Sequence, residues 1–205
     1  DEDEGYVGYG FNPPAIGNLC LQGPLADPND GIDNDKDGMI DEPGETMFPS
    51  KFLYYNNDFT LTGNPESGTD IYNYLRGIWK DNVPMTYGGD GHGSGVGATS
   101  TQCDFMFPGV TDPNFPGQQW TEVTTGNVPA DRRFLISYGP LTFESGGERE
   151  FDYAYVWAKA DAGGASASVS LLVDTYAMEI MSVFTSGGPS SNGCYVAPYP
   201  GCTDS

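Results

Sequence analysis

Basic residues are scarce in this chain of 205 residues, which has 8 Lys and Arg against 29 Asp and Glu and a formal net charge of −21. Nucleic-acid interfaces need a basic patch, so the composition excludes that class of partner. Anionic membrane surfaces are disfavoured for the same reason. Because a charge of this size opposes compaction through self-repulsion, we expect bound cations to offset it.

Other absences narrow the class of function further. The chain has one histidine, and its four cysteines show no Cys-x-x-Cys spacing, which argues against a zinc site. No apolar run approaches the length of a membrane span, so we expect no membrane insertion. No segment has the features of a signal peptide, and we therefore expect a processed, mature form or a fragment.

The most informative segment that is present is the acidic run 27–42, DPNDGIDNDKDGMIDE. It places carboxylates at alternate positions and then Gly38, where a sharp turn is needed. Ca²⁺ takes about 6–8 oxygen ligands, and a loop of this kind directs several of them at one point. The sequence therefore predicts calcium, bound by a ligand set consisting of Asp33, Asp35, Asp37, Asp41 and the carbonyl oxygen of Met39.

A second, overlapping half-site is predicted at Asp27 and Asn29 with the Gly31 carbonyl oxygen, sharing Asp33. The loop is not an EF-hand, because Gly44 stands where the bidentate Glu is required, and Glu42 and Glu45 lie beside that position. Its D-x-D-x-D-G-x-x-D spacing instead resembles the calcium repeats of thrombospondin type 3. The alternative is a solvated acidic loop, although without a cation its carboxylates would repel one another.

The four cysteines, Cys20, Cys103, Cys194 and Cys202, suggest two disulfides in an extracellular setting. Three connectivities are possible. We favour Cys194–Cys202, which would close a small Pro/Gly loop, with Cys20–Cys103 joining the N-terminal arm to the body. The alternative is a set of buried thiols.

The rest of the chain predicts a mainly β, β-sandwich-like fold with one or two helices and long loops tied by metal and disulfides. Segments 51–61, 133–138 and 149–159 have strand patterns, and the last has one aromatic face. Helical spacing occurs in 70–80 and, as an amphipathic helix, in 166–184. We expect an irregular arm with the calcium loop at 1–50, a β-rich core domain at 51–188 and a disulfide-tied tail at 189–205.

The sequence marks no catalytic constellation, so we expect a protein that is not an enzyme. His92 lies in the glycine-rich segment 86–101, which lacks the lysine of a phosphate-binding loop and reads as a surface loop or a close backbone contact. The arginines of Asp131-Arg132-Arg133 could bind an anionic ligand, but we favour a structural role in which they pair with carboxylates and order loops. Core packing is likewise favoured over a sugar platform for the aromatic residues Tyr72, Tyr74, Trp79, Tyr87 and Trp120.

A series of short motifs occurs in order along the chain: KFLYYNND at 51–58, GNP at 63–65, YNYLRGIWKD at 72–81, YGGDG at 87–91, FPG at 107–109, WTE at 120–122, DRR at 131–133, SYGP at 137–140 and AYVWA at 154–158. With the acidic loop, the arrangement resembles a region of large secreted Bacteroidetes proteins that are exported by type IX secretion. The resemblance covers roughly residues 27–185 and implies an extracellular or cell-surface location, without an agreed activity.

These observations lead us to expect a calcium-stabilised structural subunit of a filament, sheath or adhesin. The N-terminal segment is the expected contact with other copies or other surface proteins, because an extended chain there adds to the edge of a neighbouring sheet through Tyr6, Val7, Tyr9 and Phe11. The alternative function is a carbohydrate-binding or other ancillary module of a secreted enzyme, with a glycan as ligand. A hydrolase is a third possibility and would require a substrate-sized cleft containing His92.

Overall fold

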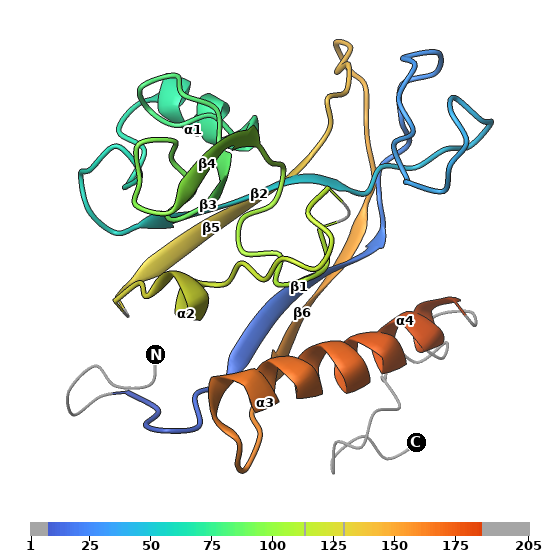
Figure 1. Cartoon of the computed structure of the whole chain (residues 1–205). Coiled ribbons are helices and arrows are strands. Elements are labelled where there is room, and N and C mark those ends of the chain that lie inside the picture. The colour runs from blue at the N-terminus through green and yellow to red at the C-terminus, as the bar shows by residue number, and fades with distance from the viewer. Residues whose placement is uncertain (1–7, 113, 129, 186–205) are drawn as a thin grey trace. The chain divides into compact units, whose positions relative to one another are not determined.

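The computed structural model describes residues 8–112, 114–128 and 130–185, and Figure 1 shows the course of the chain. The chain forms two compact units, which we call the terminal unit (Asp1–Leu21 with Asp152–Ser205) and the central unit (Gln22–Phe151). The terminal unit combines two segments that are far apart in sequence, because a strand from each segment pairs in one sheet. This division cuts across the three consecutive segments expected from the sequence.

Two small antiparallel sheets organise the central unit. Strand β2 (Pro49–Asn56) pairs with β5 (Arg132–Tyr138), with Leu53 opposite Leu135. Strand β3 (Thr86–Gly88) pairs with β4 (Ala98–Gln102) across the glycine-rich segment. A Cβ atom on Gly89 would lie 2.6 Å from the Val96 carbonyl oxygen, so this segment is the close backbone contact that its glycines indicated.

The core of the central unit is largely aromatic. Tyr87 stacks on Phe115 with ring centroids 3.7 Å apart, and Tyr74 meets Trp79 edge to face at 5.5 Å. The buried cluster consists of Leu53, Tyr74, Trp79, Met85, Tyr87, Cys103, Met106, Phe115 and Trp120. Four of the five aromatic residues considered for a sugar platform therefore pack in this core, whereas Tyr72 is exposed.

Two short helices lie in the central unit. Helix α1 (Gly68–Leu75) begins with a capping box in which the Ser67 hydroxyl accepts the Asp70 N–H at 3.1 Å. In return, the N–H groups of Glu66 and Ser67 each donate to the Asp70 carboxylate at 2.9 Å. The hydrogen bond from Glu66 is the main reason that the pKa of Asp70 is lowered. Helix α2 (Glu122–Thr125) is capped in the same way by Thr121.

The terminal unit consists of a two-stranded sheet and one continuous helix. Strands β1 (Ala15–Gln22) and β6 (Asp152–Ala158) form the sheet. The helix runs through α3 (Gly164–Ser170), the π-helical segment η1 (Leu171–Ala177) and α4 (Met178–Thr185), and it lies against the sheet (Figure 1). Leu172 packs with Val156 and Ala158, so the helix and the sheet share a small core.

The helix buries less of its apolar face than its sequence predicts. Val169 and Val173 are each 51% exposed, and Tyr176 is 38% exposed. The predicted face assumed α-helical spacing throughout, whereas Val173 and Tyr176 lie in the π-helical segment, whose i→i+5 bonds change that spacing; Val169 precedes the segment and is not explained by it. By length and composition alone, Gly164–Thr185 is also apolar enough to cross a membrane, so the statement that no run approaches that length is wrong.

Two further expectations need correction. The chain does have short strands in small antiparallel sheets and few helices, but each sheet of the described residues has two strands and they form no sandwich. Cys20 and Cys103 are not joined by a disulfide. Cys103 is buried in the core of the central unit, and Cys20 lies on β1, which belongs to the terminal unit. Cys194 and Cys202 lie outside the described residues.

Candidate metal centre

The acidic loop is closed at its base by backbone contacts. Leu25 and Thr46 form an antiparallel bridge, and the Ala26 N–H donates to the Glu45 carbonyl oxygen at 3.0 Å. A Cβ atom on Gly23 would lie only 1.6 Å from the Met47 carbonyl oxygen, so the two chain segments approach to a distance that only glycine allows. The loop is therefore held at both ends by main-chain contacts that do not depend on its carboxylates.

Within the loop, aspartate side chains form local turns with the backbone. The Asp37 N–H donates to Asp35 Oδ1 at 3.1 Å, and the Met39 N–H donates to Asp37 Oδ1 at 2.8 Å. The Gly38 N–H donates to Asp33 Oδ2 at 3.0 Å. The first two are the turns that Asp side chains commonly form with the backbone two residues on, and each of the three bonds restricts the direction of one carboxylate.

These turns bring three of the predicted ligands together. One oxygen each from Asp33, Asp35 and Asp37 lies within 4.8 Å of the others. A second group with the same spacing joins Asp35 to Glu42 and Glu45, so Asp35 belongs to both groups. Glu45 is 6% exposed, and its Oε1 accepts the backbone N–H of Asn34.

Two buried oxygens in these groups have no hydrogen-bond donor among the described residues. They are Asp33 Oδ1 and Glu42 Oε2. The hydrogen bond from its own backbone lowers the pKa of Glu42, but burial and the charges of Glu45, Asp37 and Asp35 together raise it above its ordinary value. A buried carboxylate oxygen without a partner is costly, and a cation between the carboxylates would remove that cost.

The donor set indicates which ion fits. All five side chains offer carboxylate oxygens, with no imidazole or thiolate among them, which suits a hard cation such as Ca²⁺ rather than Zn²⁺. Several carboxylates on an irregular loop also suit the variable coordination of Ca²⁺ better than the strict octahedron of Mg²⁺, which keeps several waters. The residues present therefore fit calcium.

Other predicted ligands have protein partners instead. Asp41 accepts the Gly31 N–H at 3.1 and 3.2 Å through its two oxygens. Asp27 accepts the Thr142 N–H and lies 3.5 Å from Arg149 Nη2; the hydrogen bonds from Thr142 are the main reason that its pKa is lowered. Neither residue belongs to the two groups. The roles of Asn29 and the Met39 carbonyl oxygen stay predictions.

Sequence reasoning did not assign Glu42 and Glu45 as ligands. Both were set aside because neither stands at the EF-hand position for a bidentate Glu. A turn in which the Glu45 N–H donates to the Glu42 carbonyl oxygen at 3.1 Å brings the two side chains to the same place. The Pro43-Gly44 pair between them was the available signal for that turn.

His92 is buried and has a side-chain partner at each ring nitrogen, so it does not lie in an open surface loop. Its Nε2 lies 3.0 Å from Asp81 Oδ2, and its Nδ1 lies 2.7 Å from the Ser94 hydroxyl. Only 6% of His92 is exposed. Burial alone would raise the pKa of Asp81. The hydrogen bonds from His92 and from the Val83 N–H lower this pKa by more, so the result is below its usual value. These contacts tie the glycine-rich segment to the turn after Trp79.

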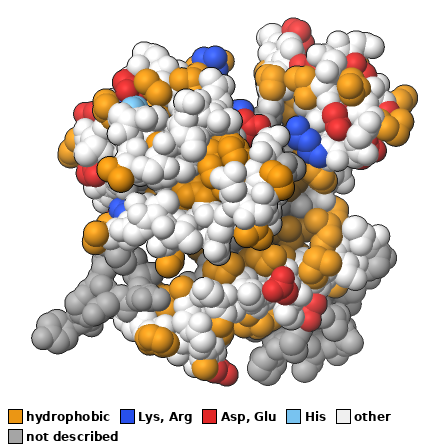
Figure 2. All heavy atoms as spheres, in the orientation of Figure 1, with side chains coloured by type: hydrophobic (Ala, Val, Ile, Leu, Met, Phe, Trp, Pro, Cys, Tyr) orange, Lys and Arg blue, Asp and Glu red, His pale blue; other side chains and the backbone are white. Residues whose placement is uncertain are grey.

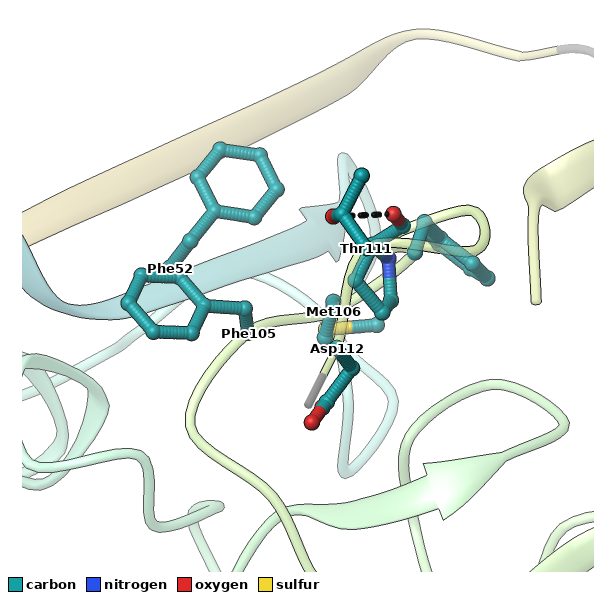
Figure 3. Close-up of a pocket in the computed structure, with 7 residues that line it drawn as sticks. Phe52, Phe105, Met106, Thr111 and Asp112 are labelled. Atoms are coloured by element: carbon teal, nitrogen blue, oxygen red, sulfur yellow. Dashed lines mark hydrogen bonds between the residues drawn. The ribbon is translucent and has the colours of Figure 1, made fainter. Parts of the chain in front are cut away.

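Two pockets lie in the central unit, and neither includes His92. The first, of about 490 Å³, is an apolar groove lined by Phe52, Phe105 and Met106 (Figure 3). The Thr111 hydroxyl in its wall donates to the Pro108 carbonyl oxygen at 2.7 Å, and Asp112 is the one charged residue among the described lining residues. This groove offers no set of groups for acid–base chemistry. The second pocket is polar and is described below.

Comparisons with protein families, with curated proteins and with solved structures gave no match, so they assign neither a fold family nor an activity to the chain.

Proposed function

We propose that the chain is a calcium-stabilised, non-enzymatic structural subunit of an extracellular or cell-surface assembly such as a filament, sheath or adhesin. The observation that carries the proposal is the acidic loop, where Asp33, Asp35 and Asp37 converge and buried carboxylate oxygens have no donor among the described residues. Millimolar calcium occurs outside cells, where calcium sites of modest affinity are filled.

Exposed apolar side chains in the terminal unit support assembly. Tyr153, Tyr155 and Trp157 are 46%, 67% and 54% exposed, and they alternate with Val156 and Ala158, which pack toward the helix. Hydrophobic side chains are numerous on the face of the molecule in Figure 2. A contiguous aromatic strip of this kind is typical of an interaction surface.

The β1–β6 sheet also has edges to which another strand can add. It contains two strands, so each strand has one edge without a ladder partner among the described residues. Two-stranded sheets are marginal alone, and an added strand would satisfy the exposed backbone groups. We propose that the added strand is the N-terminal segment of a second copy. Tyr9 and Phe11 in that segment are 60% and 79% exposed, while Tyr6 and Val7 lie outside the described residues.

Calcium and assembly are linked through charge. Two copies that each carry a formal charge of −21 repel one another, and cations bound at the acidic loop reduce that repulsion. Assembly should therefore occur in calcium and weaken in chelator. This weakening should be larger than the effect that a change of ionic strength alone has on assembly.

The test compares assembly in calcium and in chelator at matched ionic strength, by light scattering after size-exclusion chromatography and by electron microscopy. Deletion of residues 1–11 should abolish assembly while keeping Asn12, whose side chain bonds the Asp161 carbonyl oxygen and the Gly164 N–H, both at 3.0 Å. Phe11→Ser should weaken assembly, and Phe59→Ser is the matched control because both rings are 79% exposed. A strictly monomeric intact protein at high concentration in calcium would refute the structural role.

A further inference from the structure

A polar pocket of about 320 Å³ lies at one end of the β2–β5 pair, entirely within the central unit. Its polar lining consists of Tyr54, Asn56, Thr62, Asp90, Asn127 and Arg132. The volume is within the range of small-ligand sites, and several hydrogen-bonding groups converge on it, which is the usual composition of such a site. The calcium loop contributes no residue to this pocket.

Asp90 is held in place by the two buried tryptophans of the core. Trp79 Nε1 donates to the Gly91 carbonyl oxygen at 2.8 Å, and Trp120 Nε1 donates to the Gly89 carbonyl oxygen at 3.0 Å. The backbone is therefore fixed on both sides of Asp90. One carboxylate oxygen accepts the His92 N–H at 3.1 Å, and none of the described residues donates to the other. Asp90, whose backbone is fixed on both sides, therefore has one acceptor oxygen that no described residue uses, on a residue that lines the pocket.

Arg132 is fixed in a similar way on another side of the pocket. Its Nε lies 3.1 Å from Glu122 Oε1 and also bonds the Tyr54 hydroxyl, while its Nη2 donates to the Val128 carbonyl oxygen at 2.6 Å. None of the described residues accepts a hydrogen bond from Nη1. The guanidinium therefore offers fixed donors, while Glu122 balances its charge.

Three further side chains have unused hydrogen-bonding capacity. Asn56 and Asn127 make only backbone hydrogen bonds within the described residues, as does Thr62. Each amide is both a donor and an acceptor, and so is the hydroxyl. Together with Asp90 and Arg132, they line the pocket with both acceptors and donors, which are the groups that bind neighbouring hydroxyl groups.

We propose that this pocket binds one neutral sugar residue of a glycan. Asp90 accepts hydrogen bonds from ring hydroxyls, and Arg132 and the amides donate to them. An acidic sugar is disfavoured, because Glu122 already balances Arg132 and Asp90 would repel a second carboxylate. A cationic amino sugar gains one ion pair with Asp90 but meets the Arg132 guanidinium across the same small pocket.

Binding at this site rests on hydrogen bonds rather than on stacking. The Tyr54 ring meets Phe107 edge to face with centroids 5.2 Å apart, and the Arg132 guanidinium lies over the ring, 5.4 Å from its centroid. Protein groups therefore already contact the ring on which a sugar would stack. Affinity for a single sugar should therefore be weak, in the millimolar range, and contacts of several copies in an assembly would add to it.

The experiment is saturation-transfer NMR on the intact chain with methyl glucoside, methyl galactoside and methyl mannoside, alongside methyl glucuronide, glucosamine and the open-chain polyol sorbitol. At least one neutral hexoside should show saturation transfer and the other three probes should not. No transfer to any hexoside, or equal transfer to glucuronide or sorbitol, would overturn the proposal.

Variants localise the binding. Asp90→Asn keeps the acceptor for the His92 N–H but removes the charge, and it should weaken binding about tenfold. Asn127→Ala should weaken it about fivefold. Gln119→Ala is the matched control, since it truncates an exposed amide outside the pocket and should change nothing. Circular dichroism checks that each variant is folded. Equal binding by Asn127→Ala and Gln119→Ala would place the sugar elsewhere and refute the site.

Discussion

Replacing Asp33 with Asn should change the stability of the protein in opposite directions with and without calcium. The Asp33 carboxylate lies within 4.8 Å of oxygens of Asp35 and Asp37. Its Oδ1 is buried without a donor among the described residues, and its Oδ2 accepts the Gly38 N–H at 3.0 Å. Asparagine keeps the size of the side chain and one oxygen for that hydrogen bond, but it removes the charge.

In chelator, the variant should be the more stable protein. Two unit charges at the upper separation of 4.8 Å repel by about 1 kcal/mol in water and by roughly 3 kcal/mol at an effective dielectric constant near 20. Asp33 and Asp35 are partly exposed and Asp37 is exposed, so the value in water is the appropriate one. Removing the charge of Asp33 removes its repulsion with both Asp35 and Asp37 and should raise the free energy of unfolding by about 2 kcal/mol.

In calcium, the order should reverse. A ligand at 100 times its dissociation constant stabilises the folded state by about 2.7 kcal/mol. For a chain of this size, each kcal/mol raises the melting temperature by about 2–4 °C, so calcium should raise that of the native protein by about 5–11 °C. Asp33→Asn should lose most of this increase, because it removes one anionic ligand from the group.

The assay is thermal unfolding followed by circular dichroism, in excess chelator and across calcium concentrations from micromolar to millimolar. Glu179→Gln is the control, since it removes one exposed charge from α4 of the terminal unit, whereas the acidic loop belongs to the central unit, and it should behave alike in both conditions. Asp37→Ala should likewise lose stability only in calcium. Equal destabilisation of Asp33→Asn in both conditions, or a native melting temperature that calcium does not change, would refute the metal site.

Two further predictions concern buried groups of the central unit. Tyr54→Phe removes the hydroxyl that bonds Glu122 and Arg132, and in chemical denaturation it should lower the free energy of unfolding by about 1–2 kcal/mol. Tyr72→Phe is the control, because its ring is 62% exposed, and it should not lower that free energy. Equal effects of the two substitutions would contradict a stabilising role for the hydrogen bonds of Tyr54. Burial, with the nearby charges of Asp112 and Asp104, raises the pKa of Cys103 from 9.0 to about 12, so its thiol should resist iodoacetamide at pH 8 until the protein is denatured. Because the neutral thiol is favoured in the folded state, this contribution to stability is full below pH 9 and is lost as the pH rises toward 12; rapid labelling of the native protein would contradict it.

Local patterns were sufficient to predict several elements. Alternation at 149–159 and aromatic content at 51–61 predicted β6 and β2, because a period of two is a property of the strand itself. Helical spacing predicted the long helix within two residues at its N-terminal end, beginning at Gly164 rather than at 166. The π-helical segment within it was not predicted, because apolar spacing alone does not distinguish i→i+4 from i→i+5 bonding.

Long-range pairing was not accessible in the same way. The pairing of β1 with β6 joins residues more than a hundred positions apart, and neither strand carries a local mark of its partner. For the same reason the expected sandwich and the Cys20–Cys103 disulfide were wrong: both required a placement of distant segments that composition does not specify.

The candidate metal centre shows the same division. The spacing of Asp33, Asp35 and Asp37 was enough to predict that they converge, because turns between neighbouring residues orient these carboxylates. Glu42 and Glu45 join Asp35 only through the folded loop. Asp27 is in neither group and meets Thr142 and Arg149 from a distant segment, so its role as a ligand stays a prediction. The polar pocket has no sequence signature at all, since its residues come from four separate segments between 54 and 132. Short-range hydrogen bonds are encoded locally, whereas convergence of distant side chains depends on how the core packs, and that is decided only by the tertiary structure.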